Sequence, residues 1–210
     1  MADLAALADA LIKGDRNTVS KLTKQALDEN VSPKDVLEKG LIAGMDVVGK
    51  RFKANEIYVP EVLIAARAMK TGMEILKPAL EKAGVRPVAK VVLGTVKGDL
   101  HDIGKNLVGM MLTGGGLEVV DIGTDAPPDK FVQTCRDQGA KVCAMSALLT
   151  TTMPQMAEVV KALKGAGVQT KTIIGGAPVT QNYADEIGAD GYAPDAASAV
   201  DVVRELIGAA

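Results

Sequence analysis

The 210-residue sequence lacks tryptophan and has only two phenylalanines, three tyrosines and one histidine. Because aromatic residues make up 2% of the chain, recognition of nucleic acid by base stacking is not expected. The formal net charge of -2 also gives no basic surface of the kind that nucleic-acid-binding domains carry. No apolar run approaches the ~18 residues of a membrane span, and the chain opens with an amphipathic segment rather than a signal peptide.

Cysteine is also scarce, and the two cysteines are not spaced as a redox or metal motif. Cys135 and Cys143 lie among aliphatic residues and form no CxxC pair. This pattern excludes a disulfide scaffold and predicts two structural thiols in a reducing compartment. We therefore expect a cytoplasmic protein with no membrane and no nucleic-acid partner.

The composition that remains is that of a globular chain, with 48% hydrophobic and 24% charged residues. The first part has apolar residues at helical spacing and predicts four helices. They cover residues 4–12, 19–27, 33–52 and 59–76, and the third begins at Ser32-Pro33, a strong start signal. The sequence predicts a four-helix bundle over residues 1–86.

From about residue 88 the pattern changes to alternating strands and helices. The expected strands are 88–95, 117–122, 141–146, 170–174 and 191–193. The expected helices between and after them are 103–112, 128–138, 153–165, 181–187 and 197–207. The central strands are apolar on both faces, as a sheet covered by helices on both sides requires. Residues 87–210 are predicted to form a doubly wound α/β domain with five parallel strands, of the flavodoxin or Rossmann-like type.

Ligands of such sheets bind beyond the carboxyl ends of the strands, where the strand order reverses. The unusual residues lie in the loops that follow the first, third, fourth and fifth strands. The loop after the second strand, residues 123–127, lies at the same edge but carries less that needs an explanation.

His101, the only histidine, follows the first expected strand. A solitary histidine is more often a surface or hydrogen-bonded core residue than a ligand. Here Asp99 and Asp102 flank it, and Gly104 follows. A carboxylate that accepts one ring N–H fixes the tautomer and leaves the other nitrogen as a better metal ligand.

One imidazole cannot build a zinc site, which needs three or four protein ligands. A metal that takes a single ligand from the protein must bring its other ligands with it, as a macrocycle does. The pattern therefore points to a tetrapyrrole-like cofactor.

Small and hydroxylated residues follow the third and fourth expected strands and suit a long ligand. The hydroxyl residues are Ser146, Thr150, Thr151 and Thr152. At least one of them is expected to cap the helix that begins near Met153 rather than to bind a ligand. Gly175-Gly176 permits close approach of a ligand to the backbone, and equally a tight turn between strand and helix.

Asp99-x-His101-x-x-Gly104, followed by Ser146-x-Leu148-x-Thr150 and then Gly175-Gly176, resembles the cobalamin-binding signature. The N-terminal half is similar to the helical cap of methylcobalamin proteins at Glu38, residues 44–49, Phe52 and residues 59–69. The resemblance spans about residues 30–200. The chain therefore resembles a corrinoid protein of a three-component methyltransferase system, an architecture shared with the cobalamin module of methionine synthase.

The resemblance implies that His101 displaces the cofactor's dimethylbenzimidazole and becomes the lower axial ligand of cobalt. Asp99 would hold the other imidazole nitrogen, and Thr152 would complete this relay where the family has serine. In the helical part, Phe52 and Val59 would cover the upper face of the corrin, or equally form bundle core, and Glu38 would contact the ring. The other implied cofactor contacts are Gly98, Leu100, Asp102, Ile103, Gly104, Ser146, Leu148, Thr150, Gly175, Gly176 and Ala196.

The resemblance also implies a function as a methyl carrier, a non-catalytic subunit of a methyltransferase system. Cobalt(I) would accept a methyl group from a donor-specific methyltransferase, and methylcobalt(III) would pass it to a second methyltransferase that acts on tetrahydrofolate or coenzyme M. A reductive activase is a further implied partner. The methyl donor, which the partner selects, is a methylamine, methanol, a methoxylated aromatic, a betaine or a thiol.

Three other interpretations fit part of the sequence. The first is the cobalamin subunit of an adenosylcobalamin-dependent mutase, which shares the Asp-x-His-x-x-Gly loop but not the methyl-type cap. The second is a cobalamin-based sensor, against which the missing helix-turn-helix pattern and basic face count. The third is a flavodoxin-like module without a cofactor.

Overall fold

The computed structural model describes residues 3–209. Internal contacts divide the chain into two units. The first contains the residues up to Pro87 together with Gly114–Gly116, and the second contains Val88–Thr113 and the residues from Leu117 onward. Each unit is described by itself.

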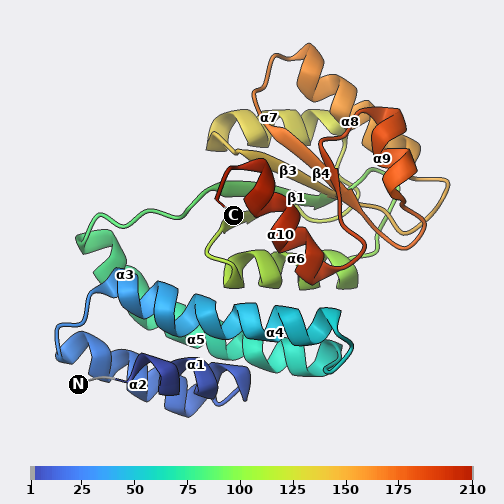
Figure 1. Ribbon diagram of the computed structural model, residues 1–210. Coiled ribbons are helices and arrows are strands. Elements are labelled where there is room, and N and C mark those ends of the chain that lie inside the picture. Colours follow the sequence, from blue (N-terminus) through green and yellow to red (C-terminus); the bar gives the residue numbers. More distant parts are fainter. Residues whose placement is uncertain (1–2, 210) are drawn as a thin grey trace. The chain divides into compact units, whose positions relative to one another are not determined.

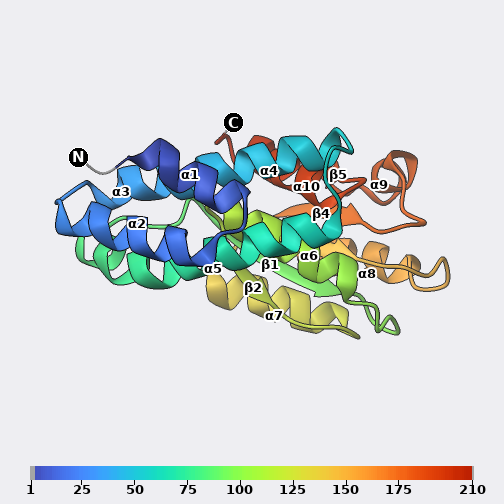
Figure 2. The ribbon, with the colours of Figure 1, turned by 90° about the horizontal axis from the view of Figure 1, so that it is seen from below.

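The first unit is helical. Its elements are α1 (Leu4–Ile12), α2 (Arg16–Asp28), α3 (Pro33–Asp35), the π-helix η1 (Val36–Ile42), α4 (Ala43–Lys53) and α5 (Val59–Lys82). Asp15 caps α2, since one of its carboxylate oxygens accepts the backbone N–H groups of Asn17 and Thr18. The long helices run side by side (Figure 2). Their apolar faces supply the buried core, which includes Leu7, Leu11, Val19, Leu41, Met45, Val48, Met69 and Leu76.

Three details of this unit differ from the prediction. The third helix is not α-helical throughout, because η1 widens its turns, and the Ser32 side chain makes no capping hydrogen bond. Over a stretch as short as η1, hydrophobic spacing does not separate π from α periodicity. The fourth helix runs on past Pro78 to Lys82, beyond its predicted end at residue 76.

The second unit is a five-stranded parallel sheet with the strand order β2-β1-β3-β4-β5. The strands are β1 (Lys90–Thr95), β2 (Glu118–Asp121), β3 (Val142–Ser146), β4 (Lys171–Gly175) and β5 (Gly191–Tyr192). The helices are α6 (Ile103–Gly114), α7 (Pro128–Gln138), α8 (Pro154–Gly165), α9 (Gln181–Ile187) and α10 (Ala196–Leu206). This order is that of the flavodoxin-like doubly wound fold, as predicted.

Helices cover both faces of this sheet. Figure 1 shows α7, α8 and α9 on one face and α6 and α10 on the other. Val91, Val92 and Leu93 of β1 are accordingly buried, because a central strand under two layers of helices has no solvent face. Cys135 and Cys143 are buried and not disulfide-bonded, as predicted.

Candidate functional site

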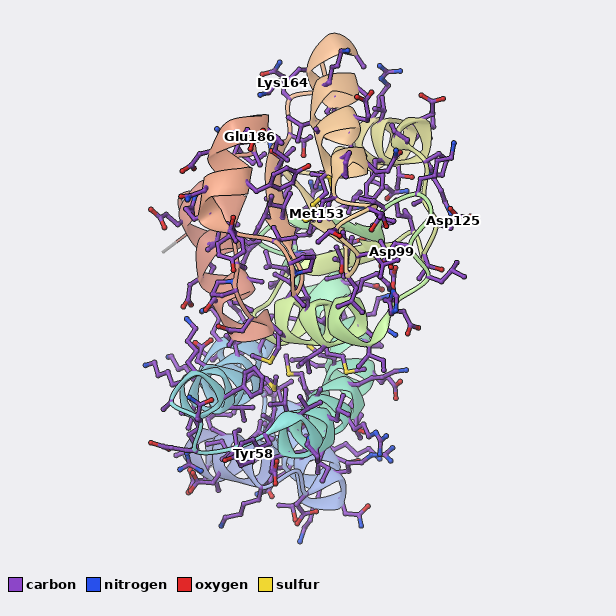
Figure 3. The ribbon with its side chains drawn as sticks, turned by 90° about the vertical axis from the view of Figure 1, so that its right-hand side faces the viewer. Tyr58, Asp99, Asp125, Met153, Lys164 and Glu186 are labelled. Carbon is purple, nitrogen blue, oxygen red and sulfur yellow. The ribbon has the colours of Figure 1, made fainter. Side chains whose placement is uncertain are left out.

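The strand order reverses between β1 and β3, so the loops that follow these two strands flank the switch point. The first loop carries Asp99 and His101, and the second carries Leu148 and Thr152. Adjacent pairing of β1 with β3 brings the loops together, although they are far apart in the sequence. Figure 3 shows Asp99 near Met153, which ends the second loop, and near Asp125.

His101 is paired with Asp99 through local geometry. The Oδ1 atom of Asp99 accepts the backbone N–H of His101 at 3.1 Å and lies 2.7 Å from Nδ1 of the same residue. An aspartate reaches the backbone two residues ahead in a turn of this kind, which is why the Asp-x-His spacing works. The Asp99 side chain is 0% exposed, whereas that of His101 is 51% exposed, so the imidazole stands out from a buried support.

The second oxygen of Asp99 is held from the neighbouring loop. Oδ2 accepts the N–H groups of Leu148 at 2.8 Å and Leu149 at 3.3 Å, and the hydroxyl of Thr152 at 2.7 Å. Thr152 therefore does occupy the relay position where the resemblance places it. The expected capping of α8 by a threonine is wrong, because Met153 stands at that position without a capping bond and the Thr152 hydroxyl is turned toward Asp99.

These contacts decide the protonation of the pair. Burial by itself would raise the pKa of Asp99, but the hydrogen bonds from Leu148, Thr152 and His101 outweigh it and hold that pKa well below its usual range. Asp99 is thus an acceptor, so the neutral tautomer that fits this geometry has its proton on Nδ1 and its lone pair on Nε2. Within residues 3–209, Nε2 has no hydrogen-bond partner.

Four exposed apolar residues lie on the segments that carry and face this pair. Leu100 precedes His101 in the first loop, Ile103 begins α6, and Leu148 and Leu149 follow β3 in the second loop. Their exposed fractions are 73% for Leu100, 81% for Ile103, 43% for Leu148 and 41% for Leu149. Exposed apolar residues gathered at one edge mark a binding surface rather than ordinary scatter. The space beside the Cα atom of Gly104 is also empty, since an added Cβ would meet no atom within 4 Å.

The two glycines at the end of β4 allow close backbone contacts at this edge of the sheet. An added Cβ at Gly176 would lie 1.9 Å from the carbonyl oxygen of Ala147, and φ at Gly176 is +136°, a conformation suited to glycine. An added Cβ at Gly175 would lie 2.9 Å from the carbonyl oxygen of Ala193. The structure thus gives a reason for both glycines that neither sequence interpretation named, namely close approach between segments of the chain itself. Contact of Gly175-Gly176 with a ligand stays a prediction.

The other predicted contacts of the α/β unit have varied surroundings. Asp102 is exposed and accepts from Asn106 of α6, whose side chain lies 3.0 Å from its Oδ2. Gly98 has φ +80°, and an added Cβ there would lie 3.6 Å from the Thr152 methyl group. Ser146 ends β3 and is half-buried, Thr150 is exposed, and Ala196 is buried at the start of α10. Their contact with a cofactor stays a prediction.

Glu38, Phe52 and Val59 belong to the helical unit. Glu38 lies in η1, 3.7 Å from Lys34 in an exposed ion pair, and Val59 is the first residue of α5. Phe52 lies in α4 and is half-buried. The predicted contact of these side chains with a corrin ring stays a prediction.

Several residues that shape the site were not identified from the sequence. The buried Thr95 donates its hydroxyl to the carbonyl of His101 at 2.8 Å. The ammonium of the buried Lys105 binds Asp121 at the end of β2 and lies 2.8 Å from the side-chain oxygen of Asn106. Asp125 contacts the His101 loop from the loop after β2. For Thr95, Asp121 and Asp125 the sequence offers only a polar residue at or just after the end of a strand. Most such residues serve turns, so this signal does not identify a site residue.

The support of Asp99 makes the stability of this unit depend on pH. Because the pKa of Asp99 is lower in the folded than in the unfolded chain, the unfolded state binds more protons below about pH 4. The stabilisation is complete above that value and is lost as the pH falls further. Asp99→Asn should cost about 2 kcal/mol near neutral pH, since an amide cannot accept from every donor around it.

The same variant should lose less unfolding free energy than the wild type on acidification from about pH 6 to about pH 3. Urea unfolding followed by far-UV circular dichroism measures both quantities. Asp129→Asn, at an exposed position of α7, serves as the matched control and should follow the wild type. Equal acid sensitivity of the Asp99→Asn variant and the wild type would contradict this assignment.

Comparison with known proteins agrees with this fold. Residues 89–201 match the model of a B12 binding domain, and residues 4–77 match a second model with the same description. The chain is 42% identical to a corrinoid protein of Desulfitobacterium hafniense over 99% of both chains. It is 41% identical to trimethylamine corrinoid protein 1 of Methanosarcina acetivorans, over 97% of this chain and 96% of the relative.

Two solved structures have the same fold over nearly the whole chain. One is a cobalamin-binding protein of Desulfitobacterium hafniense, with a TM-score of 0.82, 33% identity and coverage of 98% of this chain and 99% of that one. The other is the methanol:cobalamin methyltransferase complex MtaBC of Methanosarcina barkeri, with a TM-score of 0.86, 30% identity and coverage of 99% and 80%.

The chain therefore belongs to the family of B12-binding corrinoid proteins of methyltransferase systems, and its cofactor is cobalamin or a related corrinoid. The site fits that group. Among residues 3–209 no group of three or more His, Cys, Asp or Glu side chains could hold a metal ion, so a metal bound by His101 must bring its other ligands. No helix in that range is long and apolar enough to cross a membrane.

Proposed function

We propose that the protein is a corrinoid methyl carrier in which Nε2 of His101 is the lower axial ligand of cobalt. The observation that carries this proposal is the 2.7 Å contact of Nδ1 with a buried carboxylate, which leaves Nε2 free on an exposed ring. Bound corrinoid supplies a cobalt ion that accepts a methyl group from one partner and releases it to another. The relatives named for trimethylamine and dimethylamine support this role over that of a mutase subunit.

The residues of the chain hold and stabilise a proton at the ring. When Nε2 binds metal, Nδ1 keeps its proton on the hydrogen bond to Asp99. The hydrogen bonds from Leu148 and Thr152 hold the pKa of Asp99 well below its usual range, so its carboxylate remains an acceptor for Nδ1. This pairing would keep the ring oriented with Nε2 available to a bound metal.

The exposed apolar residues around His101 provide the surface against which a corrin macrocycle packs. Leu100 lies on the loop after β1 and Ile103 begins α6, whereas Leu148 and Leu149 lie on the loop after β3. Gly98, Asp102, Ser146, Thr150 and Ala196 would hold the nucleotide tail of the cofactor. The predicted contacts of Glu38, Phe52 and Val59 with the corrin ring are part of the same proposal.

The partners are a donor-specific methyltransferase, a second methyltransferase on the acceptor side and a reductive activase. The methanol:cobalamin methyltransferase in the MtaBC complex supports the first of these. The donor is set by that partner, and the methylamine relatives favour a methylamine.

Methyl transfer to the reconstituted full chain tests the proposal. The protein is loaded with hydroxocobalamin, reduced to cobalt(I) and mixed with a methylamine or methanol methyltransferase and its donor. We expect the cobalt(I) absorbance to disappear with at least one of these pairs, and to persist without the donor. An adenosyl group on the corrinoid extracted from the natively loaded protein would overturn the proposal in favour of the mutase subunit.

A further inference from the structure

The loop after β2 contains a strained residue that the methyl-carrier role does not explain. Among the described residues, only Asn30, Asn55 and Asp125 combine a side chain with a positive φ. The two asparagines follow the ends of α2 and α4, where a left-handed residue ordinarily terminates a helix. Asp125, with φ of +51°, terminates no helix. A strained residue away from a helix end is a reason to look for function.

Asp125 makes two hydrogen bonds to the loop that carries His101. Its Oδ1 atom accepts the backbone N–H of Gly98 at 2.7 Å, and its own N–H donates to the carbonyl of Asp99 at 3.0 Å. These two bonds bracket the Gly98-Asp99 segment from the side opposite to the loop of Leu148. Figure 3 shows Asp125 on the loop beside Asp99.

Further backbone hydrogen bonds join the loop after β2 to the end of β1. The N–H of Thr95 donates to the carbonyl of Gly123 at 2.9 Å, and the N–H of Ala126 donates to the carbonyl of Thr95 at 3.0 Å. These hydrogen bonds fix the backbone of residues 123–126 against the end of β1. Asp125 is therefore anchored before it reaches Gly98, and its left-handed conformation turns both its N–H and its carboxylate toward one segment.

Gly98 is the residue of this segment whose backbone is least restricted by its own side chain. It has φ of +80°, and as a glycine it has access to many other conformations. A change there would displace Asp99, and with it the Nδ1 hydrogen bond that sets the direction of the His101 ring. A charge-assisted bond to the Gly98 N–H opposes such a change.

We propose that Asp125 is a positioning residue for the His101–Asp99 pair, holding the loop so that Nε2 is already aimed before the cofactor binds. This inference rests on the proposed function, because it takes Nε2 to be the cobalt ligand. Asp125 is exposed, so its bond to Gly98 competes with water and contributes little to overall stability. Its effect is expected in the orientation of the ring and in the affinity for the corrinoid.

Two variants separate this role from a purely structural one. Asp125→Gly relieves the strain of the positive φ and removes the side-chain acceptor. Asp125→Asn keeps an acceptor oxygen and tolerates the left-handed conformation. If Asp125 served only the turn, the glycine variant would be harmless. If it positions the loop, the glycine variant should be impaired and the asparagine variant should approach the wild type.

The first readout uses the unloaded, untagged full-length protein, in which His101 is the only histidine. Nitrogen-15 labelling of histidine gives a single ring whose Nδ1 proton can be followed by NMR. In Asp125→Gly we expect this proton to exchange with solvent at least about tenfold faster, as the hydrogen bond to Asp99 loosens. An unchanged exchange rate in this variant would overturn the inference.

The second readout is the binding of cobalamin in its cobalt(II) form. We expect Asp125→Gly to bind about tenfold more weakly, with part of the bound cofactor keeping its own base on cobalt in the electron paramagnetic resonance spectrum. Wild-type affinity and histidine ligation in all three proteins would overturn the positioning role alone. Absence of histidine ligation in the wild type would instead overturn the proposed function.

Discussion

Replacing His101 with alanine is expected to remove the proposed bond between the protein and cobalt. The corrinoid should then keep its dimethylbenzimidazole as the lower ligand, and the absorbance spectrum of the cobalt(III) form should resemble that of free cobalamin. Loss of the ligand and of its Asp99 support should weaken binding about tenfold or more. Spectral titration of the unloaded variant with hydroxocobalamin measures both changes.

A glycine at the same position provides an internal control. His101 is half exposed, so added imidazole has access to the vacated place and can donate its N–H to Asp99. His101→Gly supplemented with imidazole should therefore recover the spectrum of the wild-type complex. Identical spectra for the wild type and His101→Ala would show that the ring is no ligand.

Gly176→Ala is expected to be among the most destabilising single substitutions in the sheet unit. The added methyl group would lie 1.9 Å from the carbonyl oxygen of Ala147, and φ of +136° is unfavourable for alanine. We expect a loss of about 3 kcal/mol or more in unfolding free energy, measured by urea titration. Ala147 precedes Leu148, whose N–H donates to Asp99, so the affinity for cobalamin should fall as well.

Gly165→Ala makes the same chemical change in open space. An added Cβ at Gly165, the last residue of α8, meets no atom within 4 Å. Alanine should there be neutral or stabilise by up to about 1 kcal/mol, because glycine is a poor helix former. Similar unfolding free energies for the two alanine variants would refute the steric explanation.

Most of the sheet unit follows from its sequence pattern. The apolar segments predicted as strands enclose the observed β1, β2, β3 and β5, and the predicted helices 128–138 and 181–187 coincide with α7 and α9. The family resemblance predicted the hydrogen-bonded pair of Asp99 and His101, and local geometry forms it, because an aspartate reaches two residues ahead without any help from the fold.

The rest of the site depends on contacts between distant segments. Asp99 takes hydrogen bonds from the backbone of Leu148 and Leu149, and backbone donors leave no mark in a sequence. Asp125 resembles any other turn aspartate until the loop after β2 is laid against the end of β1. The sequence did not indicate why Gly176 must be glycine, because only the fold brings it against the carbonyl group of Ala147.

The direct test of axial ligation by His101 is electron paramagnetic resonance of the cobalt(II) form of the cobalamin-loaded protein. The untagged protein is produced with nitrogen-15 histidine and compared with unlabelled protein. The nuclear spin of the axial nitrogen splits the cobalt lines, and His101 is the only histidine that could carry the label. If Nε2 of His101 is the ligand, the triplets of the unlabelled protein should become doublets. Triplets that persist after labelling would show the cofactor's own base still on cobalt and would contradict the account.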